Sequence, residues 1–174
     1  MQTLINSILA KAKSAEMRRY ATDLLLEICA VDTTPHADID RMRDAEKAVF
    51  SILERELDEI ALPGAHRERR LINPRISDHP AFSQLHFTKT AENPAGLPPE
   101  KVYAERGNLL YFVPGQHGGE GPDGVAINAH IDVVKPYLPP RLEGNMIYGR
   151  GTCDDKGAIV AMISAFHILG EVLA

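Results

Sequence analysis

The segment 156–174, KGAIVAMISAFHILGEVLA, predicts a helix that is apolar almost all the way round. A helix at the surface of a soluble protein keeps one polar face, whereas a helix that is apolar on every side must be covered on several sides. The fold must therefore place other elements around this helix, which makes the segment the strongest constraint on the architecture.

The segment just before it, VAINAHIDVV at 125–134, is apolar at nearly every position. This pattern predicts a strand that is buried on both faces. Further upstream, KVYAERGNLLYFVPG at 101–115 predicts two short strands around a turn at Gly107 and Asn108. The pattern before residue 62 is helical and predicts helices at 15–31 and 39–60, the second capped by Asp38 or Asp40.

Helices followed by strands and then by a buried helix predict an α/β fold, a three-layer sandwich with a mixed sheet. A chain of 174 residues is long enough for one domain. Because it offers few elements to cover the apolar helix, we expect 1–174 to be the first portion of a larger catalytic domain. The segment 62–101 is polar and rich in proline, with one strand-like piece at 83–90, and is predicted to be an irregular insertion or an edge hairpin rather than core.

Composition excludes some classes of partner. The net charge of −5 argues against nucleic acid and against an anionic membrane surface. No apolar run approaches the ~20 residues that span a bilayer. The two cysteines, Cys29 and Cys153, show no paired spacing, which suits a reducing cytoplasm. The sequence thus predicts a cytoplasmic protein with neither nucleic acid nor membrane as a partner.

His130 and Asp132 stand where the predicted strand 125–134 ends. Alternation along an extended segment places both side chains on the same side, and ligands bind at this edge of α/β sheets. A metal-bound imidazole usually donates its other N–H to a carboxylate, which this pair can provide. The same pair also occurs as an ordinary structural hydrogen bond, and taken alone it favours that interpretation.

The stretch GRGTCDDKG at 149–157 adds two adjacent carboxylates, Asp154 and Asp155, in a glycine-rich turn before the apolar helix. One aspartate in this place can simply cap the helix. Two of them facing a His-x-Asp pair exceed what a cap needs. Oxygen ligands together with imidazole suit a divalent transition ion, zinc first and cobalt or manganese next.

HIDVV at 130–134 followed by YGRGTCDDKGAIVAM at 148–162 resembles the paired metal-site motifs of a zinc-dependent exopeptidase and deacylase family. Its members include acetylornithine deacetylase, succinyl-diaminopimelate desuccinylase, aminoacylase and glutamate carboxypeptidase. ERGNLLYFVPG at 105–115 and LLLEICAVDTTP at 24–35 are similar to other parts of that family. The resemblance covers most of the chain except 62–101.

The resemblance implies a role for each matching residue. His130 would bind one zinc ion and Asp154 would bridge two, while Asp132 would be the catalytic-site carboxylate that orients His130. It also implies a cis peptide bond between Asp154 and Asp155. The implied reaction is hydrolysis of an amide bond in a small N-acyl amino acid or peptide, with two zinc ions in a complete site and cobalt or manganese as substitutes.

The chain departs from the family pattern after Asp155. The family uses an adjacent Glu-Glu pair, a later carboxylate ligand and a late histidine, and here Glu171 alone follows, without a glutamate neighbour. We therefore expect an incomplete N-terminal part that lacks the dimerisation or lid domain and is inactive in isolation. Association into a homo-oligomer through exposed apolar surface is a further expectation.

Two other functions fit parts of the sequence. The chain could be a non-catalytic, truncated relative that serves metal binding or protein association. GRGTCDDKG could instead be a phosphate- or magnesium-binding loop, but it lacks the Gly-Lys-Ser/Thr ending that a P-loop needs. Arg150 and Lys156 are predicted to be surface or capping cations without a chemical role, Cys153 a small packed residue, and His167 a hydrogen-bonded core histidine.

Overall fold

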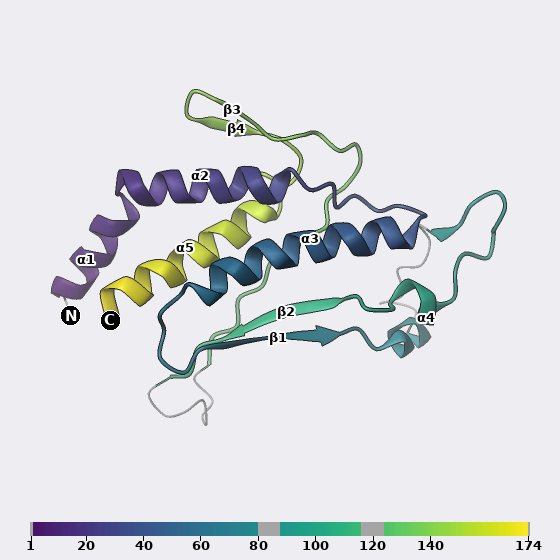
Figure 1. Cartoon of the computed structure of the whole chain (residues 1–174), viewed down its shortest axis with the longest axis horizontal. Helices are drawn as coiled ribbons and strands as arrows, with labels where there is room; N and C mark the ends of the chain where they lie inside the picture. Colours follow the sequence, from purple (N-terminus) through teal and green to yellow (C-terminus); the bar gives the residue numbers. More distant parts are fainter. Residues whose placement is uncertain (1, 80–87, 116–123, 174) are drawn as a thin grey trace.

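The computed structural model describes residues 2–79, 88–115 and 124–173. The chain begins with three helices, α1 (Gln2–Ala12), α2 (Ala15–Cys29) and α3 (Ile39–Asp58). Strand β1 (His66–Leu71), the 3-10 helix η1 (Pro74–Asp78), the short helix α4 (Pro99–Val102) and strand β2 (Gly107–Phe112) follow. Strands β3 (Arg141–Glu143) and β4 (Met146–Tyr148) lead to helix α5 (Lys156–Leu173) (Figure 1).

Helices α2, α3 and α5 confirm the helices that the sequence predicts. Two of them, α2 and α3, begin at side-chain caps. The Ser14 hydroxyl accepts from the backbone N–H of Met17 at 3.0 Å before α2. The Asp38 carboxylate accepts from the N–H groups of Asp40 and Arg41 before α3. These bonds satisfy helix N–H groups that have no partner inside the helix, so Asp38 rather than Asp40 is the cap.

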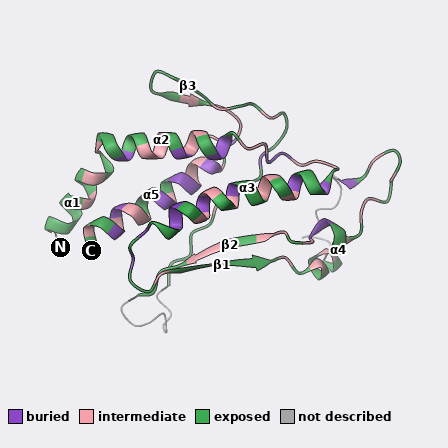
Figure 2. Cartoon of the chain, viewed as in Figure 1, coloured by how far each residue is buried: buried purple, intermediate pink, exposed green. Residues whose placement is uncertain are grey.

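The main core lies where α2, α3 and α5 face one another. Its most buried side chains are those of Ile28, Cys29 and Val49, and the cluster also contains Leu53 and Ile163. Figure 2 shows the buried residues gathered on α3, on α5 and at the end of α2, with β1 largely exposed. Strand β2 contributes Tyr111, whose ring packs edge-on against Phe166 of α5 at 5.2 Å. This core supports the start of α5, which follows directly after Asp154 and Asp155.

By length and composition, α5 is also apolar enough to cross a membrane. It packs against α1 and α2 and supplies Ile159, Val160 and Ile163 to the core. A mostly buried core helix of a soluble protein passes the same test of length and composition, and 33% of this helix is buried inside the described structure.

Strand β1 pairs antiparallel with β2, from His66 opposite Phe112 to Leu71 opposite Gly107. Strand β1 has no signature in the sequence, because its residues, HRERRL, carry no alternation of apolar and polar side chains. Ion pairs hold it to α3 instead. Arg69 binds Glu54 through two nitrogens at 2.6 and 2.7 Å.

The prediction of two strands at 101–115 is wrong. Strand β2 is the only strand in that range, and α4 precedes it. Val102 and Tyr103 turn inward and form a second small core with Ile39 and Met42 of α3. Burial of these two side chains favours a helical turn over an extended strand.

The predicted mixed sheet is not found among the described residues. Their strands form two separate antiparallel pairs, β1 with β2 and β3 with β4. The β3–β4 hairpin lies beyond α2, on the side away from β1 and β2 (Figure 1). The coarser prediction stands, since helices and sheets are combined in one chain.

The segment 125–134 is not a buried strand. It runs extended without strand pairing in the described structure, and Val125, Ile127 and Val134 are 90%, 60% and 66% exposed. A strand needs neighbours that accept its backbone hydrogen bonds and cover its faces, and the described strands pair elsewhere. Val133 is buried, while Ala129 and Ile131 pack against the main core.

The polar segment 62–101 holds β1, η1 and α4. The two helical pieces are 5 and 4 residues long, and the described part contains no long helix there. The strand-like piece at 83–90 falls mostly outside the described residues. The role of the whole segment 62–101 as an insertion stays a prediction.

Candidate metal centre

His130 and Asp154 lie together although 23 residues separate them in the sequence. The Nε2 atom of His130 is 3.4 Å from Oδ1 of Asp154. The other ring nitrogen, Nδ1, is 3.0 Å from the backbone carbonyl of Asp132 and 3.3 Å from its carboxylate Oδ1. The structure thus brings the predicted residues His130, Asp132 and Asp154 to one place.

The contacts of His130 fix its tautomer. A carbonyl oxygen can only accept, so Nδ1 carries a hydrogen and donates it to Asp132. In the neutral ring, Nε2 then presents a lone pair toward a carboxylate oxygen that also carries lone pairs. Two facing acceptors repel each other unless a proton or a metal cation lies between them. This is the tautomer that a metal-bound imidazole needs.

The charges around His130 favour a cation. Burial lowers the pKa of His130, but the hydrogen bond to the Asp132 carbonyl and the charges of Asp132, Asp155 and Asp154 together raise it above its ordinary value. Negative groups that raise the pKa of an imidazole attract a metal ion for the same electrostatic reason.

The spacing also fits zinc. Two donors bound to one tetrahedral zinc ion at about 2.0–2.1 Å lie roughly 3.3–3.4 Å apart. The observed 3.4 Å between His130 and Asp154 matches this separation. The donor types, one imidazole nitrogen and one carboxylate oxygen, are also those that zinc accepts. These two residues therefore fit as part of a zinc site.

The donor set is nevertheless small. Among residues 2–79, 88–115 and 124–173, no three His, Cys, Asp or Glu side chains are grouped so that they could hold a metal ion. The Asp154 side chain is 90% exposed and that of His130 is 49% exposed. The pair therefore forms an open half of a site.

The turn that carries Asp154 has a distinctive backbone. The peptide bond between Asp154 and Asp155 is cis, at the bond where the family resemblance implies it. Gly151 has φ +89°, and a Cβ there would lie 2.8 Å from a methyl carbon of Val133. The carboxylate of Asp155 accepts from the backbone N–H of His130 at 3.3 Å. The turn is thus tied directly to the segment of His130.

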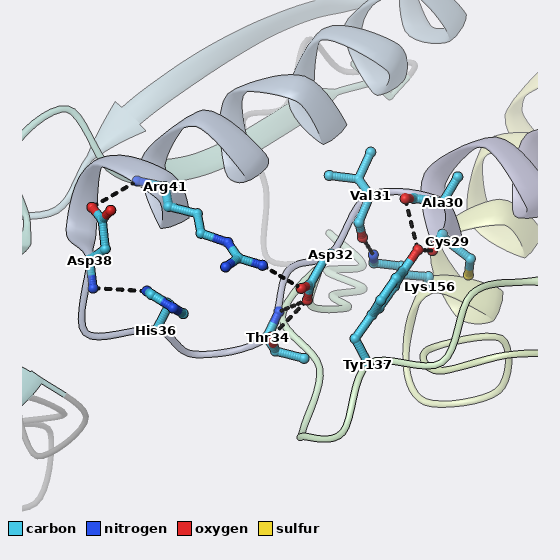
Figure 3. Close-up of polar contacts among 10 residues, drawn as sticks. All are labelled: Cys29, Ala30, Val31, Asp32, Thr34, His36, Asp38, Arg41, Tyr137 and Lys156. Carbon is cyan, nitrogen blue, oxygen red and sulfur yellow. Dashed lines mark hydrogen bonds and ion pairs between the residues drawn. The ribbon is translucent and has the colours of Figure 1, made fainter.

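Lys156 is a functional candidate, and its prediction as a surface or capping cation is wrong. Its side chain is fully buried, and Nζ donates to the carbonyls of Ile28 and Val31 at 2.9 Å each. Figure 3 shows the bond to Val31. Burial lowers the pKa of Lys156 from its ordinary value. A lysine at the first position of a helix that is apolar all round was the signal that could have indicated this burial.

The structure also describes Cys153, predicted to be packed, His167, predicted to be a hydrogen-bonded core residue, and Arg150, predicted to be a surface or capping cation. Cys153 is exposed rather than packed. The Nε2 atom of His167 is buried and has no hydrogen-bond partner among the described residues, and its ring packs edge-on against Tyr20 at 4.9 Å. Arg150 donates from Nε to the Pro136 carbonyl at 3.1 Å, which is a structural contact.

Residues 126–173 match the family model of Peptidase family M20/M25/M40. This segment is an M20-family segment. It contains His130, Asp132, Asp154 and Asp155, so the geometry described above falls inside the matched region. The resemblance seen in the two motifs is confirmed for this part of the chain.

Parts of the chain are similar to archaeal hydrolases. A LysW-lysine/LysW-ornithine hydrolase of Sulfurisphaera tokodaii is 43% identical over 51 residues, which is 29% of this chain and 15% of that protein. The enzymes of the same name from Saccharolobus islandicus and Saccharolobus solfataricus are 36% and 35% identical over 75 residues, 41% of this chain and 21% of theirs. The matched part of the chain thus spans about a fifth or less of these relatives. No solved structure matches the chain.

Proposed function

We propose that the chain is the N-terminal part of a metal-dependent hydrolase that cleaves amide bonds in N-acyl amino acids or small peptides. One observation carries the proposal. Within the M20-family segment, His130 Nε2 and Asp154 Oδ1 face each other at 3.4 Å while Nδ1 is held by Asp132. The complete domain would be a three-layer α/β sandwich of a soluble, cytoplasmic enzyme.

In this proposal His130 and Asp154 hold the metal, zinc or else cobalt or manganese. A bound zinc ion would polarise the substrate carbonyl and lower the pKa of a bound water. The residues of this chain do the positioning. Asp132 keeps the hydrogen on Nδ1 so that Nε2 stays free to bind, and Asp155 holds the backbone at His130.

The substrate class is inferred from the relatives and from the resemblance. The names of the relatives describe hydrolysis of lysine or ornithine joined to LysW. We propose that the substrate of this chain is likewise an amino acid that carries an acyl group, and that it is a small molecule or short peptide.

Cobalt titration tests the metal site, because a histidine-bound cobalt ion absorbs visible light. The 174-residue chain should bind cobalt weakly, since the described residues supply two ligands and a zinc-type site takes three or four from the protein. His130→Ala and Asp154→Asn should each lower the affinity at least about tenfold. His66→Ala, which removes an exposed histidine from β1, is the matched control and should leave the affinity unchanged.

An activity assay on the same protein tests the enzymatic half. We expect the 174-residue chain to hydrolyse acetylornithine or hippurate-type substrates negligibly, because the family's general base has no counterpart after Asp155. General-base catalysis is typically worth ~10²–10⁴-fold. Turnover that disappears with His130→Ala would show that another residue or subunit completes the site. Cobalt binding that both variants leave intact would contradict the metal site itself.

A non-catalytic, truncated relative would give a different result in the activity assay. A relative kept for metal binding alone should bind cobalt through His130 and Asp154, yet stay inactive when the missing ligands are supplied by a longer chain. Joining residues 1–174 to the remainder of an M20-family hydrolase and assaying the product separates the two functions.

A further inference from the structure

The carbonyl groups at the end of α2 receive donors from distant parts of the chain. The last carbonyls of a helix have no partner within the helix. Here Lys156 donates to the carbonyls of Ile28 and Val31. The Tyr137 hydroxyl is 2.8 Å from the Ala30 carbonyl and 3.2 Å from that of Cys29 (Figure 3). Four successive carbonyls, those of residues 28–31, are therefore bound by two side chains. Tyr137 lies three residues after the segment 125–134, and Lys156 lies two residues after Asp154.

The next residues of this connection hold the segment that carries His130. The Thr33 hydroxyl donates to the carbonyl of Ile131 at 2.6 Å, and the backbone N–H of Val133 donates to the Thr33 carbonyl at 3.4 Å. Thr33 is only 6% exposed. The two bonds bracket Asp132, which holds Nδ1 of His130.

The connection is itself fixed by a polar network. The Asp32 carboxylate accepts from the N–H and hydroxyl of Thr34 at 3.0 and 2.7 Å, and from Arg41 of α3 at 3.1 Å (Figure 3). Such a turn, closed by a side chain onto its own backbone, restricts the conformations of the residues around it. Residues 28–34, which we call the anchor loop, therefore offer a fixed reference for whatever binds to them.

Lys156 connects the other half of the candidate site to the same loop. It lies two residues after Asp154, and its buried stem packs at Gly151, where an added Cβ would lie 3.2 Å from Lys156 Cδ. A buried ammonium group is unfavourable unless it is hydrogen-bonded. The carbonyl end of α2 compensates it, because the helix dipole places partial negative charge there. A cation that served only as a cap could have stayed exposed.

We propose that Thr33 and Lys156 are positioning residues, which fasten the segments of His130 and Asp154 to one anchor loop and thereby set the separation of the two metal ligands. The hydrogen bonds of the Thr33 and Lys156 side chains go to backbone carbonyls and not to the side chain of His130 or Asp154. Thr33 sets the place of residues 130–133, and Lys156 sets the place of the Asp154 turn. The inference rests on the proposed function, since it takes His130 and Asp154 as metal ligands.

Thr33→Val and Thr33→Ser test the first contact, since valine keeps the shape but loses the hydroxyl and serine keeps the hydroxyl. Lys156→Met tests the second, because it keeps an unbranched buried chain without the ammonium group. Thr33→Val and Lys156→Met should each weaken cobalt binding about 10–100-fold, the usual effect of losing a group that orients a metal ligand. Thr33→Ser should stay within about threefold of the unaltered chain.

Stability must be separated from positioning. Leu53→Ala removes a buried side chain of α3 from the main core and serves as the control. It should lower the urea midpoint yet leave cobalt affinity unchanged where the protein is folded. If Thr33→Val and Lys156→Met weaken binding no more than Leu53→Ala does under folded conditions, the proposal is overturned.

A readout without metal distinguishes failure of the inference from failure of the proposed function. Nitrogen NMR of the metal-free chain reports the His130 tautomer, which should be Nδ1–H in the unaltered chain and in Thr33→Ser. Thr33→Val and Lys156→Met should shift the His130 ring signals. Shifted signals in a chain that binds no cobalt would uphold the positioning and refute the metal site. Unshifted signals in both variants, together with unchanged cobalt binding, would overturn the positioning.

Discussion

At the scale of single residues, the glycines of GRGTCDDKG are required by their neighbours within the chain. At Gly157 an added Cβ would lie 2.5 Å from the Thr152 carbonyl oxygen, which belongs to the backbone of the same turn. The turn is therefore closed against itself at this position.

Gly157→Ala tests this closure with two opposing effects. Alanine in a helix is favoured over glycine by roughly 1 kcal/mol, and Gly157 lies in the first turn of α5. The contact with the Thr152 carbonyl should outweigh that gain, and we expect a net loss of about 1–3 kcal/mol of unfolding free energy, as overpacking usually costs. Urea unfolding measures it.

Gly115→Ala is the matched control, since no atom of the described residues, apart from the chain neighbours of Gly115, lies within 4 Å of the added Cβ. It should change the unfolding free energy by no more than about 0.5 kcal/mol. A Gly157→Ala chain as stable as this control would show that the turn can open to admit a side chain.

At the scale of elements, β1 is a strand that charge rather than apolar patterning holds in place. Glu54 of α3 accepts two hydrogen bonds from Arg69 and lies 3.2 Å from Arg67. The hydrogen bond from Arg69, followed by the arginine charges, holds the pKa of Glu54 below its ordinary value of 4.5 despite the opposing effect of burial. The α3–β1 contact therefore depends on an ionised carboxylate.

Glu54→Gln should destabilise the chain by about 1–2 kcal/mol at pH 7, because hydrogen bonds to charged groups contribute roughly 1.5–3 kcal/mol and this pair is partly exposed. Since the folded pKa is lowered, the contribution is fully present above pH 4.5 and is lost as the pH falls through the folded pKa. The difference between the two proteins should therefore shrink in acid. Urea unfolding at pH 7 and at about pH 3 measures it.

Glu68→Gln provides the comparison on the same strand. Glu68 pairs with Arg70 at 2.6 Å, but the two side chains are 40% and 68% exposed. Exposed pairs contribute little, so the change should be within about 0.5 kcal/mol at either pH. An equal effect from both substitutions would mean that β1 is not held by its contact with α3.

The same elements show what the sequence could and could not predict. Apolar periodicity and capping side chains identified α2, α3 and α5, since helices are specified by neighbours along the chain. Strands depend on partners distant in sequence, and this is why charged β1 was missed and 125–134 was taken for a strand. The proximity of His130 and Asp154 followed from two motifs, whereas the burial of Lys156 depends on α2 and has no signature at its own position beyond an apolar context.

At the scale of the whole molecule, the main core among α2, α3 and α5 holds the larger group of buried apolar side chains, whereas Val125, Ile127 and Val134 of the segment 125–134 are exposed. Ile163→Ala and Ile127→Ala compare the two with the same chemical change. Ile163 is 4% exposed and Ile127 is 60% exposed. We expect losses of about 2–5 kcal/mol for Ile163→Ala and of about 1 kcal/mol or less for Ile127→Ala.

Equal losses from these two isoleucines would show that 125–134 is buried in solution, as the sequence alone suggested. A total stability of about 5–15 kcal/mol is usual for a domain, so Ile163→Ala removes a large part of it. The expected result is therefore a clearly lower urea midpoint for Ile163→Ala than for Ile127→Ala.

The extended course of 125–134 has a consequence for local opening. Among the described residues, the backbone N–H groups of this segment that donate are those of His130 and Val133, whereas α5 carries a continuous helical ladder. Amide deuterium uptake should therefore be fast at 125–129 and slow along α5. A boundary of local unfolding then runs between the two candidate ligands. A metal ion bound to both ligands would oppose local opening of the segment that holds His130. Cobalt should therefore slow deuterium uptake around His130 more than anywhere along α5.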